Sequence, residues 1–158
     1  RHTRSLCDWS SDVCSSDLEP LMRRALAISE ASYGPEHPVV ARDLNNLALL
    51  LQTTNRLEEA EPLMRRALTI DEASYGPEHP DVARDLNNLV LLLQTTNRLE
   101  EAEPLMRRMV EILLTFTRQG FEHPYLQAGL NNYERLLQAM GLSEEEIQTK
   151  LTNLQQPT

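Results

Sequence analysis

The sequence predicts an all-α fold, a right-handed superhelical solenoid built from antiparallel helix pairs, and three observations support this. Residues 19–60 and 61–102 are copies of one 42-residue unit, and a diverged third copy starts at residue 103. Within each unit, apolar residues recur at the three- and four-residue intervals of an amphipathic helix, and strand signals are absent. Fixed self-similarity at this period is typical of stacked units rather than one globular core. The first two copies differ at four positions: Ala27/Thr69, Ser29/Asp71, Val39/Asp81 and Ala48/Val90.

Each full unit contains two predicted helices. In the first full unit, the apolar pattern predicts one helix from residue 38 to about 54 and another from 57 to about 74. Gly76, followed by a proline, fits the residue that ends a helix. His79 and Pro80 fit the cap and the first position of the next helix.

The domain organisation follows from these units. We expect a single repeat array over residues 19–158, which begins with a second helix that lacks its partner. Ser143 and Glu146 form a capping box that opens a last, closing helix. The predicted parts are an orphaned helix at 19–33, repeat one at 38–75, repeat two at 80–118 and a degenerate capping pair at 124–155.

Residues 1–18 differ in character from the rest and hold both cysteines, Cys7 and Cys14. Read back into DNA, the stretch DWSSDVCSSDL corresponds to the end of a common sequencing-library adapter. We therefore expect residues 1–18 to be non-native and disordered, and the natural N-terminus to lie outside this sequence. The remainder contains no cysteine, which excludes disulfides and thiolate metal sites from it.

Composition and motifs argue against several functions. The net charge of −9 disfavours binding to nucleic acid or to an anionic membrane, and no apolar run reaches the ~18 residues of a membrane span. His37, His79 and His123 each stand in a Glu-His-Pro turn, one per unit, too far apart to share an ion. No nucleophile or phosphate-loop motif is present. We expect no enzymatic activity, no cofactor and no metal, and a cytoplasmic location.

The stretch LNNLALLLQTTNRLEEAEPLMRRAL and the junction YGPEHP resemble the tetratricopeptide repeats, specifically the 42-residue kind found in kinesin light chains. The resemblance implies a scaffold that binds a peptide or protein segment in a concave groove lined by the first helix of each repeat. The alternative is a structural spacer or self-association module of a larger signalling NTPase or effector protein. Self-association would use the exposed face of the N-terminal helix.

The candidate groove residues come from helix geometry. At ~100° per residue, one stripe of each first helix lies opposite its apolar side. Pairs of adjacent asparagines occur on all three first helices, and the resemblance implies that they hydrogen-bond the backbone of an extended peptide. An asparagine ladder that only ties the repeats together is equally compatible with the sequence. The candidates are Arg42, Asn45, Asn46, Leu49, Thr53, Arg84, Asn87, Asn88, Leu91, Thr95, Asn131, Asn132 and Arg135.

Arginine pairs on the second helices, such as Arg23-Arg24 and Arg65-Arg66, could attract phosphates. However, Glu19 and Glu61 precede them by four residues, in the order that favours ion pairing along a helix. We therefore expect these arginines to form a self-paired, solvated face.

Overall fold

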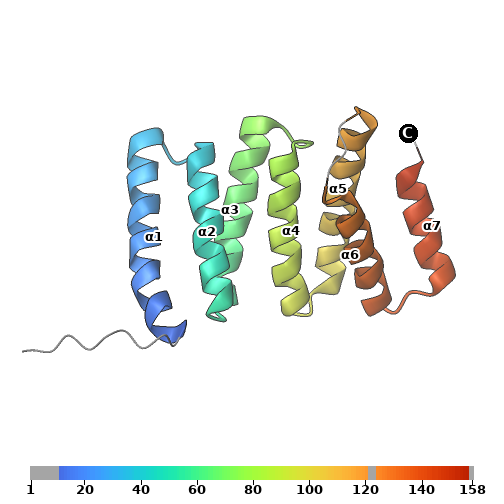
Figure 1. Ribbon diagram of the computed structural model, residues 1–158, viewed down its shortest axis with the longest axis horizontal. Helices are drawn as coiled ribbons and strands as arrows, with labels where there is room; N and C mark the ends of the chain where they lie inside the picture. Colours follow the sequence, from blue (N-terminus) through green and yellow to red (C-terminus); the bar gives the residue numbers. More distant parts are fainter. Residues whose placement is uncertain (1–10, 121–123, 157–158) are drawn as a thin grey trace, which may run out of the picture.

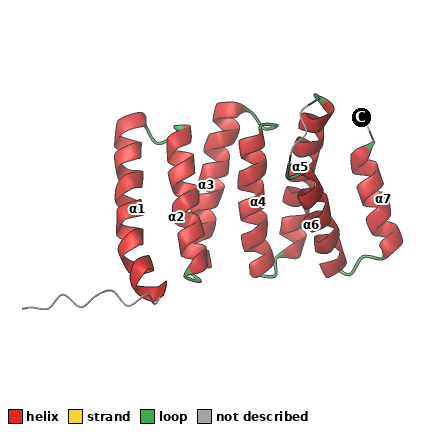
Figure 2. Ribbon diagram, in the orientation of Figure 1, coloured by secondary structure: helices red, strands yellow, loops and turns green. Residues whose placement is uncertain are grey.

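The computed structural model describes residues 11–120 and 124–156, and within them seven α-helices stand side by side in one row (Figure 1). Short loops join them, and the described residues contain no strand (Figure 2). The all-α fold predicted from the repeats is therefore confirmed. The helices are α1 (Ser11–Tyr33), α2 (Pro38–Thr53), α3 (Leu57–Tyr75), α4 (Pro80–Thr95), α5 (Leu99–Arg118), α6 (Leu126–Ala139) and α7 (Glu144–Gln155).

Each helix packs mainly against its neighbours in the sequence, as a solenoid requires. Among the described residues, the only other close helix approaches join α2 to α4 and α5 to α7. The first helices of the two full repeats therefore meet directly, whereas α4 and α6 do not come as close. The alanines of the second helices make the close packing possible: Ala60 and Ala67 in α3 are fully buried, and so is Ala102 in α5.

The helix starts depend on the side chains predicted from the turn motif. His37 and His79 are extended, and the Nδ1 atom of each accepts a hydrogen bond from the backbone N–H two residues on, at 3.2 Å. These histidines are thus helix caps. Gly76 ends α3 with a φ of 90°, a backbone conformation that residues other than glycine rarely adopt. His123 lies outside the described residues.

The N-terminal helix is longer than the sequence predicts. It begins at Ser11 rather than near residue 19, so residues 11–18 are helical and the expectation of disorder is wrong for them. Residues 1–10, including Cys7, lie outside the described part. The non-native origin of residues 1–18 stays a prediction.

The C-terminal pair closes the core. In α7, Ser143 and Glu146 form the predicted capping box, and Ile147 is buried against the other helices. A polar contact joins this helix to the array, because Lys150 Nζ lies 3.0 Å from Glu103 Oε1 on α5. The same oxygen accepts a hydrogen bond of 2.8 Å from the hydroxyl of Tyr133 on α6.

Candidate functional site

The stripe predicted on the first helices is accessible to solvent. On α2, Arg42, Asn46 and Thr53 are exposed, and Leu49 is 38% exposed. On α4, Leu91 is 42% exposed at the equivalent position. The remaining members of the stripe are also exposed or half-buried: Arg84, Asn88, Thr95, Asn132 and Arg135.

Asn45 does not belong to this accessible face. It is only 4% exposed, and its Nδ2 donates a hydrogen bond of 2.7 Å to Asp85 Oδ1 on α4. The expectation of a groove position is wrong for this residue, because its side of α2 packs against the first helix of the next repeat. Here the asparagine ties two repeats together.

The other two residues at this repeat position behave differently. Asn87 on α4 is half-buried, and its amide makes no hydrogen bond within the described residues. Asn131 on α6 is exposed and accepts a hydrogen bond of 3.0 Å from Gln127 on the same helix. The three residues have the same amide but three different surroundings.

Asn45 bonds to one member of a buried carboxyl pair that the sequence analysis missed. Asp71 on α3 and Asp85 on α4 are 1% and 0% exposed. Asp71 Oδ1 and Asp85 Oδ2 are buried without a donor. Burial, followed by a hydrogen bond between the two carboxyl groups, raises the pKa of Asp85 to about 7. Burial also raises the pKa of Asp71. One shared proton supplies the missing donor, since two adjacent buried carboxylates cannot both stay ionised.

In the preceding repeat, the equivalent contact joins a serine hydroxyl to a single carboxyl group. Ser29 on α1 occupies the position of Asp71, and its hydroxyl donates a hydrogen bond of 2.6 Å to Asp43 Oδ2 on α2. The exchange of Ser29 for Asp71 is one of the four differences between the two copies. A proton held between Asp71 and Asp85 would thus take the place of the serine hydroxyl proton.

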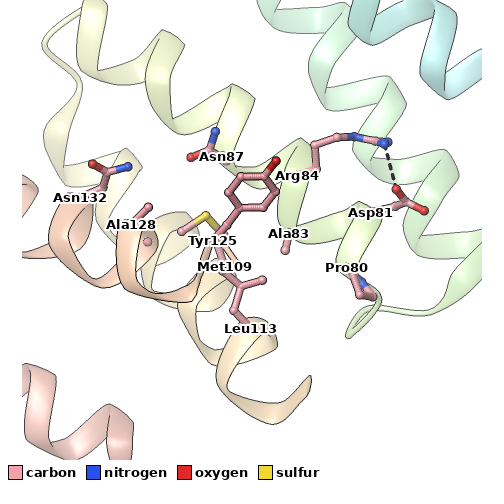
Figure 3. Close-up of a pocket in the computed structure, with 11 residues that line it drawn as sticks. Pro80, Asp81, Ala83, Arg84, Asn87, Met109, Leu113, Tyr125, Ala128 and Asn132 are labelled. Atoms are coloured by element: carbon pink, nitrogen blue, oxygen red, sulfur yellow. Dashed lines mark ion pairs between the residues drawn. The ribbon is translucent and has the colours of Figure 1, made fainter. Parts of the chain in front are cut away.

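A cavity of about 500 Å³ lies where α4, α5 and α6 meet (Figure 3). Its lining is mostly apolar and includes Ala83, Met109 and Leu113, while Asn87 and Asn132 contribute amides from α4 and α6. Arg84 belongs both to the lining and to the stripe, so the cavity opens onto the candidate groove. The guanidinium of Arg84 lies 2.8 Å from Asp81 Oδ1, one turn earlier on α4.

A smaller hollow of about 350 Å³ occupies the equivalent position one repeat earlier, between α2 and α4. Its lining has more charged side chains, among them Arg42, Arg84 and Asp71, beside the apolar Pro38 and Val39. The two hollows therefore repeat in position but differ in character.

The predicted pairing of the second-helix arginines is confirmed in part. Arg23 and Arg65 pair along their own helices. Arg66 and Arg108 pair with the preceding second helix. However, Arg24 and Arg107 form no ion pair within the described residues.

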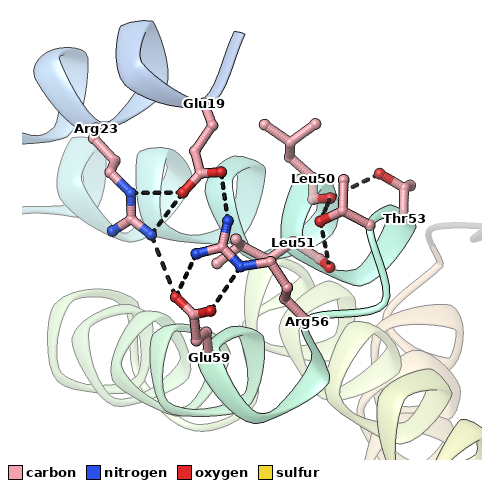
Figure 4. Close-up of polar contacts among 8 residues, drawn as sticks. Glu19, Arg23, Leu50, Leu51, Thr53, Arg56 and Glu59 are labelled. Atoms are coloured by element: carbon pink, nitrogen blue, oxygen red, sulfur yellow. Dashed lines mark hydrogen bonds and ion pairs between the residues drawn. The ribbon is translucent and has the colours of Figure 1, made fainter. Parts of the chain in front are cut away.

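A network around Glu19 also joins two repeats (Figure 4). Glu19 on α1 bonds both to Arg23 on its own helix, at 2.8 Å, and to Arg56 at the start of α3. Arg56 also contacts Glu59 at 2.6 Å. The next repeat has the same network, formed by Glu61, Arg65, Arg98 and Glu101. The hydrogen bonds from Arg23 and Arg56 lower the pKa of Glu19.

The described residues offer little for other chemistries. No cluster of three or more histidine, cysteine, aspartate or glutamate side chains that could hold a metal occurs among them. None of the helices in this part of the chain is long and apolar enough to cross a membrane.

Comparison with known proteins begins with a negative result: none of the curated proteins matches the sequence significantly. Solved structures do match the fold. A putative kinesin light chain with nearly identical TPR-like repeats from Podosopora anserina superposes with a TM-score of 0.67 at 23% identity, over 89% of this chain and 67% of that one. A substituted variant of the same protein gives 0.69 at 24% identity, over 89% and 65%. BtubC (BKLC) from P. vanneervenii gives 0.74 at 22%, over 91% and 60%.

This chain thus spans about two thirds of the length of those structures. The family itself is shown by sequence. The profile of the tetratricopeptide repeat matches residues 17–73 and 44–115, which together cover more than half of the chain. The chain belongs to the tetratricopeptide repeat family, whose repeats generally mediate protein–protein interaction.

Proposed function

We propose that this chain is a scaffold that holds an extended segment of a partner protein along the face formed by α2, α4 and α6. The observation that carries the proposal is the accessible stripe on the first helices, which continues into the cavity between α4 and α6. Asn46 and Asn88 on this stripe make no hydrogen bond within the described residues.

The stripe has the chemistry that an extended segment requires. An asparagine amide donates and accepts at once, which matches the N–H and C=O of a peptide unit. Leu49 and Leu91, at 38% and 42% exposed, offer apolar contacts beside the amides. Arg42 and Arg135 are exposed on the same face and could meet acidic side chains of the partner.

A peptide library displayed on phage tests this function. Peptides selected on the whole chain are measured by calorimetry against the wild type and against a chain carrying Asn46→Ala and Asn88→Ala. The double variant should weaken binding by about tenfold, since each lost hydrogen bond contributes about 0.5–1.5 kcal/mol. Its thermal transition should hardly change, because both side chains lack internal partners. Asn153→Ala, an exposed asparagine on α7, is the control.

Either a binding result or a stability result would contradict the proposal. One is that no selected peptide binds, or that the double variant binds as well as the wild type. The other is a large fall in melting temperature for the double variant, which would assign these asparagines to holding the repeats together.

A second candidate, self-association, is favoured by the apolar face of α1. Leu21 and Ile28 on that helix are 62% and 55% exposed. Ile70, which occupies the position of Ile28 in the next unit, is only 1% exposed because α2 and α3 pack together. If α1 pairs with a second copy, light scattering of the whole chain should give a dimer mass that falls to a monomer for Ile28→Glu. A monomeric wild type would remove this candidate.

A further inference from the structure

Successive first helices face each other at two places, between α2 and α4 and between α4 and α6. Equivalent repeat positions form both places, but they hold different residues. We call the junction of α2 with α4 the first interface and that of α4 with α6 the second interface. Alignment of the repeats places Asn45, Asp71, Arg84 and Asp85 at the first interface, and Asn87, Leu113, Ala128 and Gly129 at the second. Of these four positions, the first is an asparagine at both interfaces. The other three are charged at the first interface and apolar at the second.

Charged residues occupy the first interface and line part of its smaller hollow. Asn45 bonds to Asp85, the carboxyl group of Asp71 faces that of Asp85, and Arg84 Nη2 lies 3.4 Å from Asp85 Oδ1. Asn45 Oδ1, Asp71 Oδ1 and Asp85 Oδ2 are buried here without a hydrogen-bond partner within the described residues, so the interface combines polar contacts with unsatisfied polar atoms. An apolar side chain from a partner would have to displace buried polar contacts, which is unfavourable.

The second interface is less closely packed, and Tyr125 also lines its cavity, where its ring lies between Asn87 and Met109 (Figure 3). Among the described residues, α4 and α6 do not approach each other as closely as α2 and α4 do. Gly129 replaces the aspartate, and a Cβ at this position would lie 3.2 Å from Met109 Cε and 3.4 Å from Leu113 Cδ1. Met109 and Leu113 thus reach the backbone of α6 and form an apolar floor. The adjacent cavity has about 500 Å³, within the range of about 300–1,000 Å³ that is typical of ligand sites.

Because a glycine replaces the aspartate, the asparagine amide at the second interface also lacks the acceptor that Asn45 has at the first. Asn87 occupies the position of Asn45, but its counterpart on the next helix is Gly129, which has no side-chain acceptor to offer. Asn87 and Asn132 line the cavity from opposite helices, and neither amide is hydrogen-bonded within the described residues (Figure 3). An apolar floor flanked by two unsatisfied amides suits an apolar side chain together with the peptide groups on either side of it.

We infer that the second interface is the anchor site for an extended partner segment: its cavity receives one apolar side chain, and Asn87 and Asn132 hydrogen-bond the adjoining main chain. The inference rests on the proposed function and deepens it, because it fixes where along the array the segment is anchored. The first interface presents charged groups beside its smaller hollow, and the positions of Met109 and Leu113 are held there by Ala67 and Asp71. A bound segment therefore carries its apolar anchor next to α6 and polar residues next to α2.

N-acetyl-leucine-methylamide, which carries one apolar side chain between two peptide groups, is a direct probe. Titrated into the whole isotope-labelled chain, it should give saturable shifts of the Asn87 and Asn132 side-chain amide signals in NMR spectra. N-acetyl-serine-methylamide should give much smaller shifts. Absence of leucine-dependent shifts at these two amides, or larger shifts at the first interface, would overturn the inference.

Filling the cavity separates this inference from the proposed function. Ala128→Leu places a larger side chain at an exposed helical position of the lining, and Gln138→Leu makes a similar change elsewhere on α6. For the library-selected peptides, Ala128→Leu should raise the Kd by about tenfold or more, which corresponds to one apolar side chain no longer buried, while Gln138→Leu should not. Peptides that bind both variants equally would refute the anchor site and leave groove binding intact. If no peptide binds at all, the proposed function fails as well, and leucine-dependent shifts would then support only the pocket.

Discussion

Replacement of Asp71 by serine tests the buried carboxyl pair directly, because the preceding unit already has a serine, Ser29, at this position. Ser29 donates a hydrogen bond of 2.6 Å to Asp43 in the first unit. In the Asp71→Ser variant, the new hydroxyl should donate to Asp85 in the same way. Asp85 then needs no proton of its own, since Asn45 and the serine both donate to it.

The pKa of Asp85 fixes the sign and the size of the effect. The unfolded carboxyl group has a pKa near 3.8, and burial beside Asp71 raises it to about 7 in the fold. Between these values the folded chain holds a proton that the unfolded chain has released, so stability falls as pH rises. At about 1.4 kcal/mol per pH unit, the loss approaches about 4 kcal/mol as an upper limit, because water and nearby charges reduce it. The charged and titratable groups around the pair are Arg84 and Asp81 from α4 and His79 at its cap.

Urea denaturation followed by circular dichroism, at several values between about pH 4.5 and pH 7.5, measures this loss. The wild type should lose stability toward the upper end of the range, and Asp71→Ser should lose much less. Glutamates with lowered pKa values, such as Glu61, have the opposite effect, because the stability that they contribute to the fold is lost as pH falls. They are the same in both chains, so the difference between the two curves isolates the pair.

Parallel curves for the two proteins would refute the reasoning, because they would mean that no proton is held between Asp71 and Asp85. The reverse exchange, Ser29→Asp, gives a second test in the first unit. It should introduce a loss of stability with rising pH, although a smaller one, because the Asp43 side chain is 14% exposed whereas Asp85 is fully buried.

Three further changes should destabilise the fold by distinct routes, each measurable as a shift in the urea midpoint. Asn45→Ala removes the donor to buried Asp85 and should cost about 1–3 kcal/mol, whereas Asn131→Ala, at the exposed equivalent, should cost little. Tyr133→Phe removes the hydrogen bond to Glu103 and should cost about 1 kcal/mol without loss of packing. Gly76→Ala places a Cβ on a residue with a φ of 90° and should cost about 1–3 kcal/mol, although no atom lies close enough to clash.

Much of the fold was predictable because local signals repeat. The Glu-His-Pro turns and the glycines set the helix boundaries, and the observed bounds of α2 and α3 lie within one residue of the predicted ones. One local feature was overlooked: Asn55 and Asn97 adopt φ values of 60° and 57° in the turns between paired helices. Asparagine directly after a pair of threonines at a helix end was the signal.

The candidate site was less predictable, because helix periodicity locates a face but does not show where the neighbouring repeat lies. Asn45 and Asn46 are adjacent, yet one is buried against α4 and the other is exposed. The partner of Asn45 is Asp85, 40 residues away. Gly129 lines the cavity, and its equivalent one repeat earlier is the buried Asp85, so the difference between the two interfaces appears only when the packing is seen.

The first and second helices of the repeats also differ in what their side chains do. The ion pairs of Glu19, Arg56 and Glu59 link α1 to α3, and the same residue types recur in the next unit, so the second helices hold the stacking by a repeated network. The first helices carry the accessible stripe, and α4 and α6 line the cavity together with Met109 and Leu113 of α5. Substitutions at Leu113, Ala128 or Gly129 therefore change one interface without altering the ion-pair network. Nearly identical units can thus differ at one interface, which is where we propose the anchor site.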